Sequence, residues 1–118
     1  MKLENKIKLI VDALEDIKAR DVTVIDTHKL TSLFERMVVA TGESNRQTKS
    51  LAAHVHDKVK AAGEYVGNTE GGDTGDWVLL DLGDVIVHVM QPATRSLYNL
   101  EELWGAGQAV RKQAAKGA

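Results

Sequence analysis

Apolar side chains recur at helical spacing near the start of the chain and again around its middle. Residues 3 to about 20 place leucine, isoleucine and valine three or four positions apart, with charged residues between them, which predicts an amphipathic helix. A second such stretch follows Ser44. Ser44 and Gln47 have the spacing of a capping box, and Gly63 offers a left-handed stop. The pattern therefore predicts two helices that each pack one face on a core.

Short apolar runs between and after these helices predict strands. Residues 22–26 read as a short strand, and the continuous run 37–41 indicates a strand covered on both faces. A further strand is expected to begin at Tyr65, followed by a glycine-rich surface loop over residues 68–75. The runs 77–82 and 85–90 flank Gly83-Asp84, a two-residue hairpin signal with glycine first. Pro92 can begin a helix, and residues 93–104 favour one or two short helical pieces.

The order of these elements predicts one α/β (α+β) domain, a mixed sheet of about five strands with helices packed on it. The first two strands can form a hairpin, and the helix after Ser44 can serve as a crossover. The chain has 118 residues, the length of a single domain. We expect residues 1–104 to form this domain and residues 105–118 to form a basic, Ala-rich tail that is partly disordered.

The predicted hairpin has two different faces. A two-residue turn places six aliphatic side chains on one face, which must be core. The other face is mixed, with the cross-strand pairs Trp77–Met90, Leu79–His88 and Asp81–Ile86. Two interpretations stay open. A helix over residues 96–104 covers this face and Asp81 bonds His88 diagonally, or part of the face is a docking patch anchored by Trp77.

Charge and composition narrow the function. Fifteen Lys and Arg are interspersed with seventeen Asp and Glu, for a net charge of -2, so the basic footprint of a nucleic-acid binder is missing. A basic protein is the better partner, without direct sequence-specific binding to nucleic acid. The chain contains no cysteine, and no apolar run approaches a membrane span. We expect a cytoplasmic protein that makes no membrane contact.

No residue pattern predicts catalysis, a cofactor or a metal ion. His54 and His56 are two positions apart on a helix, so their imidazoles point apart and cannot converge on a metal. The strongest enzymatic alternative is nucleotidyl transfer, suggested by Gly42 and Ser44 where a strand leads into a helix. That chemistry needs clustered carboxylates to hold magnesium, and Asp81 and Asp84 lie on either side of the turn. We therefore expect a protein that is not an enzyme.

Three segments together resemble a known family. Residues 38–47 (VVATGESNRQ), 76–90 (DWVLLDLGDVIVHVM) and 95–104 (RSLYNLEELW) closely resemble the ribosomal silencing factor family, also called RsfS or Iojap-like. The resemblance implies a fold like a degenerate nucleotidyltransferase domain. It also implies binding to the fourteenth protein of the large ribosomal subunit, which would block joining of the small subunit and repress translation.

The resemblance implies a docking surface near the hairpin. By analogy with the family, Trp77, Leu82, Met90 and Tyr98 contribute to this surface, and Asp81 and His88 shape it. Leu82 is ambiguous, because the hairpin register places it on the core face while the family resemblance places it at the interface. Whether the free protein forms a homodimer through the same apolar patch is left open.

Overall fold

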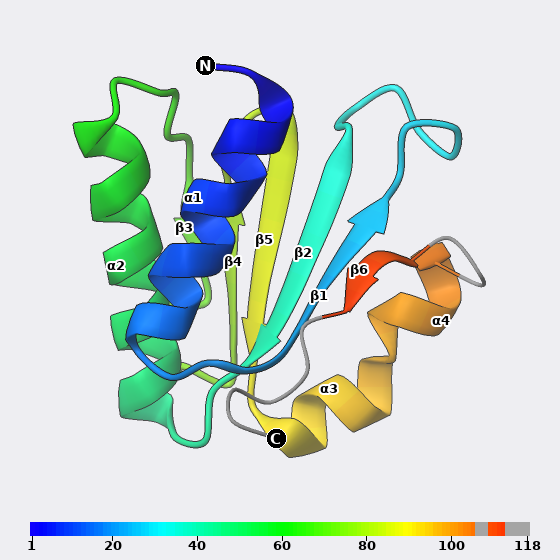
Figure 1. Ribbon diagram of the computed structural model, residues 1–118. Helices are drawn as coiled ribbons and strands as arrows, with labels where there is room; N and C mark the ends of the chain where they lie inside the picture. The colour runs from blue at the N-terminus through cyan, green and yellow to red at the C-terminus, as the bar shows by residue number, and fades with distance from the viewer. Residues whose placement is uncertain (106–108, 113–118) are drawn as a thin grey trace.

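The computed structural model describes residues 1–105 and 109–112, with side chains as far as Trp104. Helices α1 (Leu3–Asp16) and α2 (Asn45–Ala61) lie on one face of a central sheet, and the short helices α3 (Pro92–Tyr98) and α4 (Leu100–Gly105) lie at the other (Figure 1). One or two short helical pieces were predicted after Pro92, and the structure has two. Within the described residues, no helix has both the length and the apolar character to cross a membrane.

The sheet has the strand order β3-β4-β5-β2-β1-β6 and is mixed, because β2 pairs in parallel with β5 and all other neighbours are antiparallel. The predicted mixed sheet of about five strands is confirmed, with the short strand β6 added from the tail. The predicted partial disorder of the tail falls largely on residues 106–108 and 113–118, which lie outside the described residues. The strands are β1 (Arg20–Asp26), β2 (Arg36–Thr41), β3 (Thr69–Glu70), β4 (Trp77–Asp81), β5 (Val85–Met90) and β6 (Ala109–Lys112).

The main core lies between the sheet and the two long helices. The apolar stripe of α1 is buried there as predicted, and β2 is buried on both faces from Met37 to Thr41. Helix α1 ends at Asp16, earlier than the predicted residue 20. Lys18 adopts a left-handed φ of 62°, and the Ala19 amide donates to the Leu14 carbonyl at 3.0 Å. This closure turns the chain into β1 without a glycine.

The predicted cap of α2 is confirmed. The Gln47 amide donates to Ser44 Oγ at 3.1 Å, and Gln47 Oε1 accepts from the Glu43 amide at 2.7 Å. Gln47 Nε2 also donates to the Ile17 carbonyl at 3.0 Å. The cap therefore satisfies the start of α2 and also ties it to the end of α1. At the other end of the helix, Gly63 has a φ of 79°, the left-handed stop that the sequence predicted.

The strand predicted to begin at Tyr65 begins at Thr69 instead. The preceding segment still follows β4, because Gly67 donates to the Asp81 carbonyl and Asp81 donates to the Asn68 carbonyl, at 2.7 and 3.0 Å. Strand β4 ends at Asp81, so Tyr65 lies beyond the last residue that could pair with it. The Tyr65 side chain is 62% exposed.

The predicted register of the β4–β5 hairpin is confirmed at every pair from Trp77–Met90 to Asp81–Ile86. Gly83 supplies the turn with a φ of 84°. Helix α1 also holds this turn, because the buried Lys6 ammonium donates to the Leu82 carbonyl and to Asp84 Oδ1, both at 2.6 Å. The hairpin is thus fixed in register by its own turn and in position by α1.

Candidate functional site on the open sheet face

The sheet face opposite α1 and α2, called here the open face, carries a second and smaller apolar cluster. Helices α3 and α4 cover only one end of this face (Figure 1). The buried members of the cluster come from β1, β2, β5 and α4, and three aromatic side chains pack around them. The buried members are Ile25, Met37, Val39, Met90 and Leu100, and the surrounding rings are those of Phe34, Trp77 and Trp104.

Trp77, at the start of β4, joins three elements through its ring. Its indole Nε1 donates to His88 Nδ1 on β5 at 2.9 Å. Its ring centroid lies 4.9 Å from that of Tyr98 on α3, with the planes inclined by 44°, a favourable tilted aromatic contact. Trp77 is partly exposed and Tyr98 is 53% exposed. We call Trp77, His88 and Tyr98 the aromatic cluster.

His88 is a neutral acceptor in this cluster. Its side chain is buried, and burial lowers the pKa of His88 to about 4. The Trp77 N–H requires a free lone pair on Nδ1, so the ring proton lies on Nε2. The diagonal bond between Asp81 and His88 considered from the sequence does not form, because Asp81 Oδ1 accepts from the Gly83 amide at 2.9 Å. Asp81 stabilises the turn, and Trp77 is the partner of His88.

This arrangement predicts a pH dependence of stability. The unfolded chain protonates His88 near pH 6.5, whereas the folded chain keeps it neutral down to about pH 4. Between these values the unfolded state binds more protons, so stability falls as the pH falls. We expect the titration of this residue to lower the free energy of unfolding by about 2 kcal/mol between pH 7.5 and pH 5. Urea unfolding at pH 7.5 and pH 5.0 measures it.

The control for the pH effect is His88→Gln, whose side-chain oxygen can accept from the indole but cannot titrate. The variant should lose less stability than the wild-type chain between the two pH values. All other titrating groups are the same in both proteins, so they cancel in the comparison. An equal loss in both would show that His88 does not carry the effect.

Three of the six residues predicted to form the docking surface are buried, and one of them, His88, was expected only to shape that surface. Leu82 and Met90 are both 0% exposed, so neither side chain can contact a partner in this conformation, and their assignment to the docking surface is corrected. Leu82 belongs to the core beneath α1 and α2, as its register indicated. Met90 supports the aromatic cluster from the second apolar cluster. Of the predicted set, the structure brings together Trp77, His88 and Tyr98.

A groove continues the open face beyond the aromatic cluster. Its volume is about 310 Å³, and it lies between α4, the mixed face of the hairpin and β3. The ionisable side chains that line it are Asp81, Glu70 and the neutral His88, with no Lys or Arg among the lining residues. The remaining lining residues are Phe34, Met37, Asn68, Leu79, Ile86, Leu100 and Trp104. We call this feature the acidic groove.

The open face therefore matches neither of the two sequence interpretations alone. Met90 is buried with Leu100 of α4 and His88 is buried too, while Leu79 and Ile86 stay partly exposed along the acidic groove. The face is core at one end and accessible at the other.

Several apolar residues around this face were not among those predicted from the sequence to bind a partner. Leu97 and Leu103 are 75% and 74% exposed, and the Phe34 ring lies 5.6 Å from that of Trp104. The signal was the recurrence of leucine at positions 97, 100 and 103. Only Leu100 is buried among these three leucines, so a spacing typical of a core-facing helix here leaves two leucines in solvent. Exposed leucines beside a groove are typical of interaction sites.

The histidines weighed as metal ligands bind different carboxylates. His54 Nε2 lies 3.0 Å from Asp16 Oδ2 on α1, and His56 Nδ1 lies 3.1 Å from Asp57 Oδ1. Across residues 1–104, where side chains are described, no group of three or more His, Asp or Glu could hold a metal ion. The carboxylates weighed for nucleotidyl transfer are engaged separately, Asp84 with Lys6 and Asp81 with the turn.

The chain is similar in sequence and in fold to several known proteins. The family model described as "Ribosomal silencing factor during starvation" matches residues 1–117. The "Ribosomal silencing factor RsfS" of Chromobacterium violaceum is 55% identical over 105 residues, which cover 89% of this chain and 86% of that protein. A crystal structure of a Chromobacterium violaceum protein superposes with a TM-score of 0.87 at 55% identity, covering 89% of this chain and 88% of that one.

A more distant relative carries a different name. The mouse protein "Mitochondrial assembly of ribosomal large subunit protein 1" is 30% identical over 101 residues, which cover 83% of this chain and 44% of that protein. The resemblance drawn from three sequence segments is confirmed along nearly the whole chain. On this sequence and fold similarity, the chain belongs to the ribosomal silencing factor (RsfS) family.

Proposed function

We propose that this protein binds the large ribosomal subunit through its fourteenth protein and prevents the small subunit from joining, so that translation in the cytoplasm is repressed. The observation that carries the proposal is the aromatic cluster, in which a partly exposed Trp77 and a half-exposed Tyr98 stack beside His88, a residue that lines the acidic groove. Membership in the ribosomal silencing factor family supports the ribosome as the binding partner.

The chemistry of the open face suits a basic protein. Aromatic rings that are partly buried before binding lose little conformational freedom on docking, which is one reason that Trp and Tyr concentrate at interfaces. The acidic groove offers two carboxylates and no cation. A partner with an apolar side chain beside a Lys or Arg would fill the groove with the apolar side chain. Its cation would form ion pairs with the two carboxylates. Naked RNA would meet these carboxylates unfavourably.

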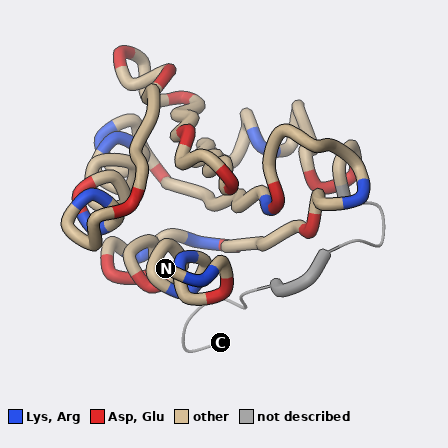
Figure 2. Tube along the Cα trace, turned by 90° about the horizontal axis from the view of Figure 1, so that it is seen from above, with Lys and Arg blue, Asp and Glu red and all other residues tan. Residues whose placement is uncertain are grey.

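The charge distribution supports the same partner class. Lys, Arg, Asp and Glu are interspersed along the described part of the chain (Figure 2), and the net charge is -2. Extended contact with the phosphate backbone requires a concentrated basic surface. The binding we propose is therefore to a ribosomal protein.

The mechanism is steric. The chain forms a body of 33 × 31 × 29 Å, and a stable protein interface buries roughly 1,200–2,000 Å² in total. Docking on such an area leaves most of the body standing above the ribosomal surface. If the docking position lies on the face that meets the small subunit, the two subunits cannot close around it. This repression requires no chemical step.

Co-sedimentation with purified ribosomal particles tests the proposed function. The protein should sediment with dissociated large subunits and be depleted from small subunits and from intact ribosomes. Adding it before the small subunit should reduce the yield of intact ribosomes in proportion to its occupancy. Equal recovery with large subunits and intact ribosomes would contradict the proposal, because a protein on the joining face cannot stay bound in both.

A further inference from the structure

The two short helices that frame the aromatic cluster are attached to the sheet by little apolar burial. Helix α3 has no buried residue. Among the described side chains of α4, only Leu100 is buried, at 7% exposure. Leu97, Tyr98 and Leu103 are more than half exposed. Apolar packing normally holds a helix on a sheet, so these helices need another attachment.

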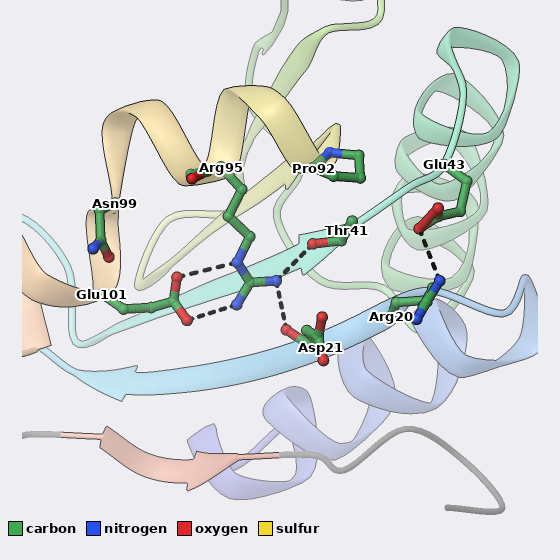
Figure 3. A pocket seen from close by; sticks show the side chains of 9 residues that line it. Arg20, Asp21, Thr41, Glu43, Pro92, Arg95, Asn99 and Glu101 are labelled. Carbon is green, nitrogen blue, oxygen red and sulfur yellow. Dashed lines mark hydrogen bonds and ion pairs between the residues drawn. The ribbon is translucent and has the colours of Figure 1, made fainter.

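Arg95 of α3 supplies that attachment. Its Nε and Nη2 donate to the two carboxylate oxygens of Glu101 on α4, at 3.1 and 2.7 Å. Its Nη1 donates to the Asp21 carbonyl on β1 at 2.6 Å and to Thr41 Oγ1 on β2 at 2.8 Å. The second N–H of Nη2 donates to Thr23 Oγ1 on β1 at 3.1 Å. One side chain thus connects four elements (Figure 3).

The guanidinium is fully used in these contacts. Arginine has five N–H donors in a fixed fork, and the five hydrogen bonds above account for all of them. The side chain is 11% exposed and its ion-pair partner Glu101 is 32% exposed. The adjoining cavity of about 490 Å³ is therefore not offered a free donor by Arg95. The residue holds the helices in place and has no donor left for a ligand.

The corner between α3 and α4 carries this attachment to Tyr98. Asn99 adopts a left-handed φ of 29°, and its amide donates to the Arg95 carbonyl at 2.9 Å. Asn99 Oδ1 also accepts from the Glu102 amide at 3.3 Å. Tyr98 lies one helical turn beyond Arg95, so the orientation of α3 that Arg95 sets also places the Tyr98 ring over Trp77.

We propose that Arg95 is the positioning residue of the docking surface, and that its five hydrogen bonds hold α3 and α4 against β1 and β2 so that Tyr98 stacks on Trp77. The partner binds the aromatic cluster and Arg95 lies behind it. This proposal rests on the proposed function for its binding readout only. The position of the helices can be measured without any partner.

The test is Arg95→Met, which keeps the aliphatic stem and removes all five donors. Hydrogen exchange of the backbone amides in α3 and α4 should accelerate about tenfold or more, while those of α1, α2 and β2 keep their wild-type rates. Binding to purified large subunits should weaken about tenfold or more. Arg95→Lys keeps the charge but not the fork, so it should restore part of both effects.

The matched control is Arg20→Met in the same cavity. Arg20 is 59% exposed and pairs only weakly with Glu43, at 3.4 Å, so this variant should behave as the wild-type protein in both measurements. If Arg95→Met does not fold, Glu101→Gln replaces it. That variant should give a smaller acceleration confined to α3 and α4, because it weakens two of the five hydrogen bonds.

The outcomes separate the two proposals. Unchanged amide exchange in α3 and α4 of Arg95→Met, or of Glu101→Gln where that variant is used, would overturn the positioning role. Accelerated exchange together with unchanged binding would also overturn it, because the docking surface would then not depend on where these helices lie. If the wild-type protein fails to bind large subunits, the proposed function fails and the exchange result alone decides the role of Arg95.

Discussion

Trp77→Ala should weaken binding to the large ribosomal subunit by about 2 kcal/mol or more, roughly a thirtyfold increase in Kd. The substitution removes the ring that stacks on Tyr98 at 4.9 Å and leaves His88 Nδ1 without its indole donor. Both losses fall on the centre of the aromatic cluster, where contact energy concentrates in interfaces. Titration of purified large subunits with the labelled protein measures the change.

Two further variants separate binding from folding. Trp77→Phe keeps a ring against Tyr98 but loses the hydrogen bond to His88, so its affinity should lie between those of the wild type and the alanine variant. Tyr65→Ala removes an aromatic ring that is 62% exposed near Gly83, at the opposite end of β4. It should bind within about 0.5 kcal/mol of the wild type. A Trp77→Ala protein that is folded and binds large subunits normally would contradict the assignment of Trp77 to the docking surface.

Leu82→Ala should cost about 2–5 kcal/mol of folding stability and leave the affinity of the folded protein unchanged. Leu82 is fully buried in the core beneath α1 and α2, and truncating such a side chain loses transfer free energy and leaves a cavity. The hydrogen bond from Lys6 ends on the Leu82 backbone carbonyl, so the variant removes packing and keeps that contact. Urea unfolding measures the stability, and subunit titration corrected for the folded fraction measures affinity.

The control for Leu82 is Leu79→Ala on the same strand. Leu79 points to the opposite face, is partly exposed and lines the acidic groove. The Leu79→Ala protein should lose less folding stability than the Leu82→Ala protein, and its affinity for the large subunit should fall instead. The reverse result, with Leu82→Ala stable and unable to bind, would return Leu82 to the interface that the family resemblance implied.

The sequence predicted those parts of the fold that depend on neighbours a few residues away. The register of the β4–β5 hairpin followed from Gly83 and Asp84, because a two-residue turn leaves one possible pairing of the flanking strands. The start of α2 followed from the spacing of Ser44 and Gln47, and the two-sided burial of β2 followed from an uninterrupted apolar run. The family was recognisable for the same reason, since its three segments are continuous in the sequence.

The details of the candidate site depend on contacts that local patterns do not contain. Alternation placed Trp77 and His88 on one face, but the burial of His88, which lowers its pKa, depends on how the rest of the chain packs around the hairpin. Asp81 could bond either His88 or the turn, and the folded geometry selected the Gly83 amide. The strand expected to begin at Tyr65 does not form there, because β4, with which it would pair, ends at Asp81.

By itself, the sequence determined two packed helices, a hairpin with one apolar and one mixed face, and the family to which they belong. Only the tertiary structure decided that Leu82 and Met90 are buried, that an acidic groove adjoins the aromatic cluster, and that Arg95 fastens α3 and α4 to β1. The physical reason is separation along the chain. Arg95 and the Asp21 carbonyl lie 74 positions apart, so their contact exists only once the sheet has brought distant segments together.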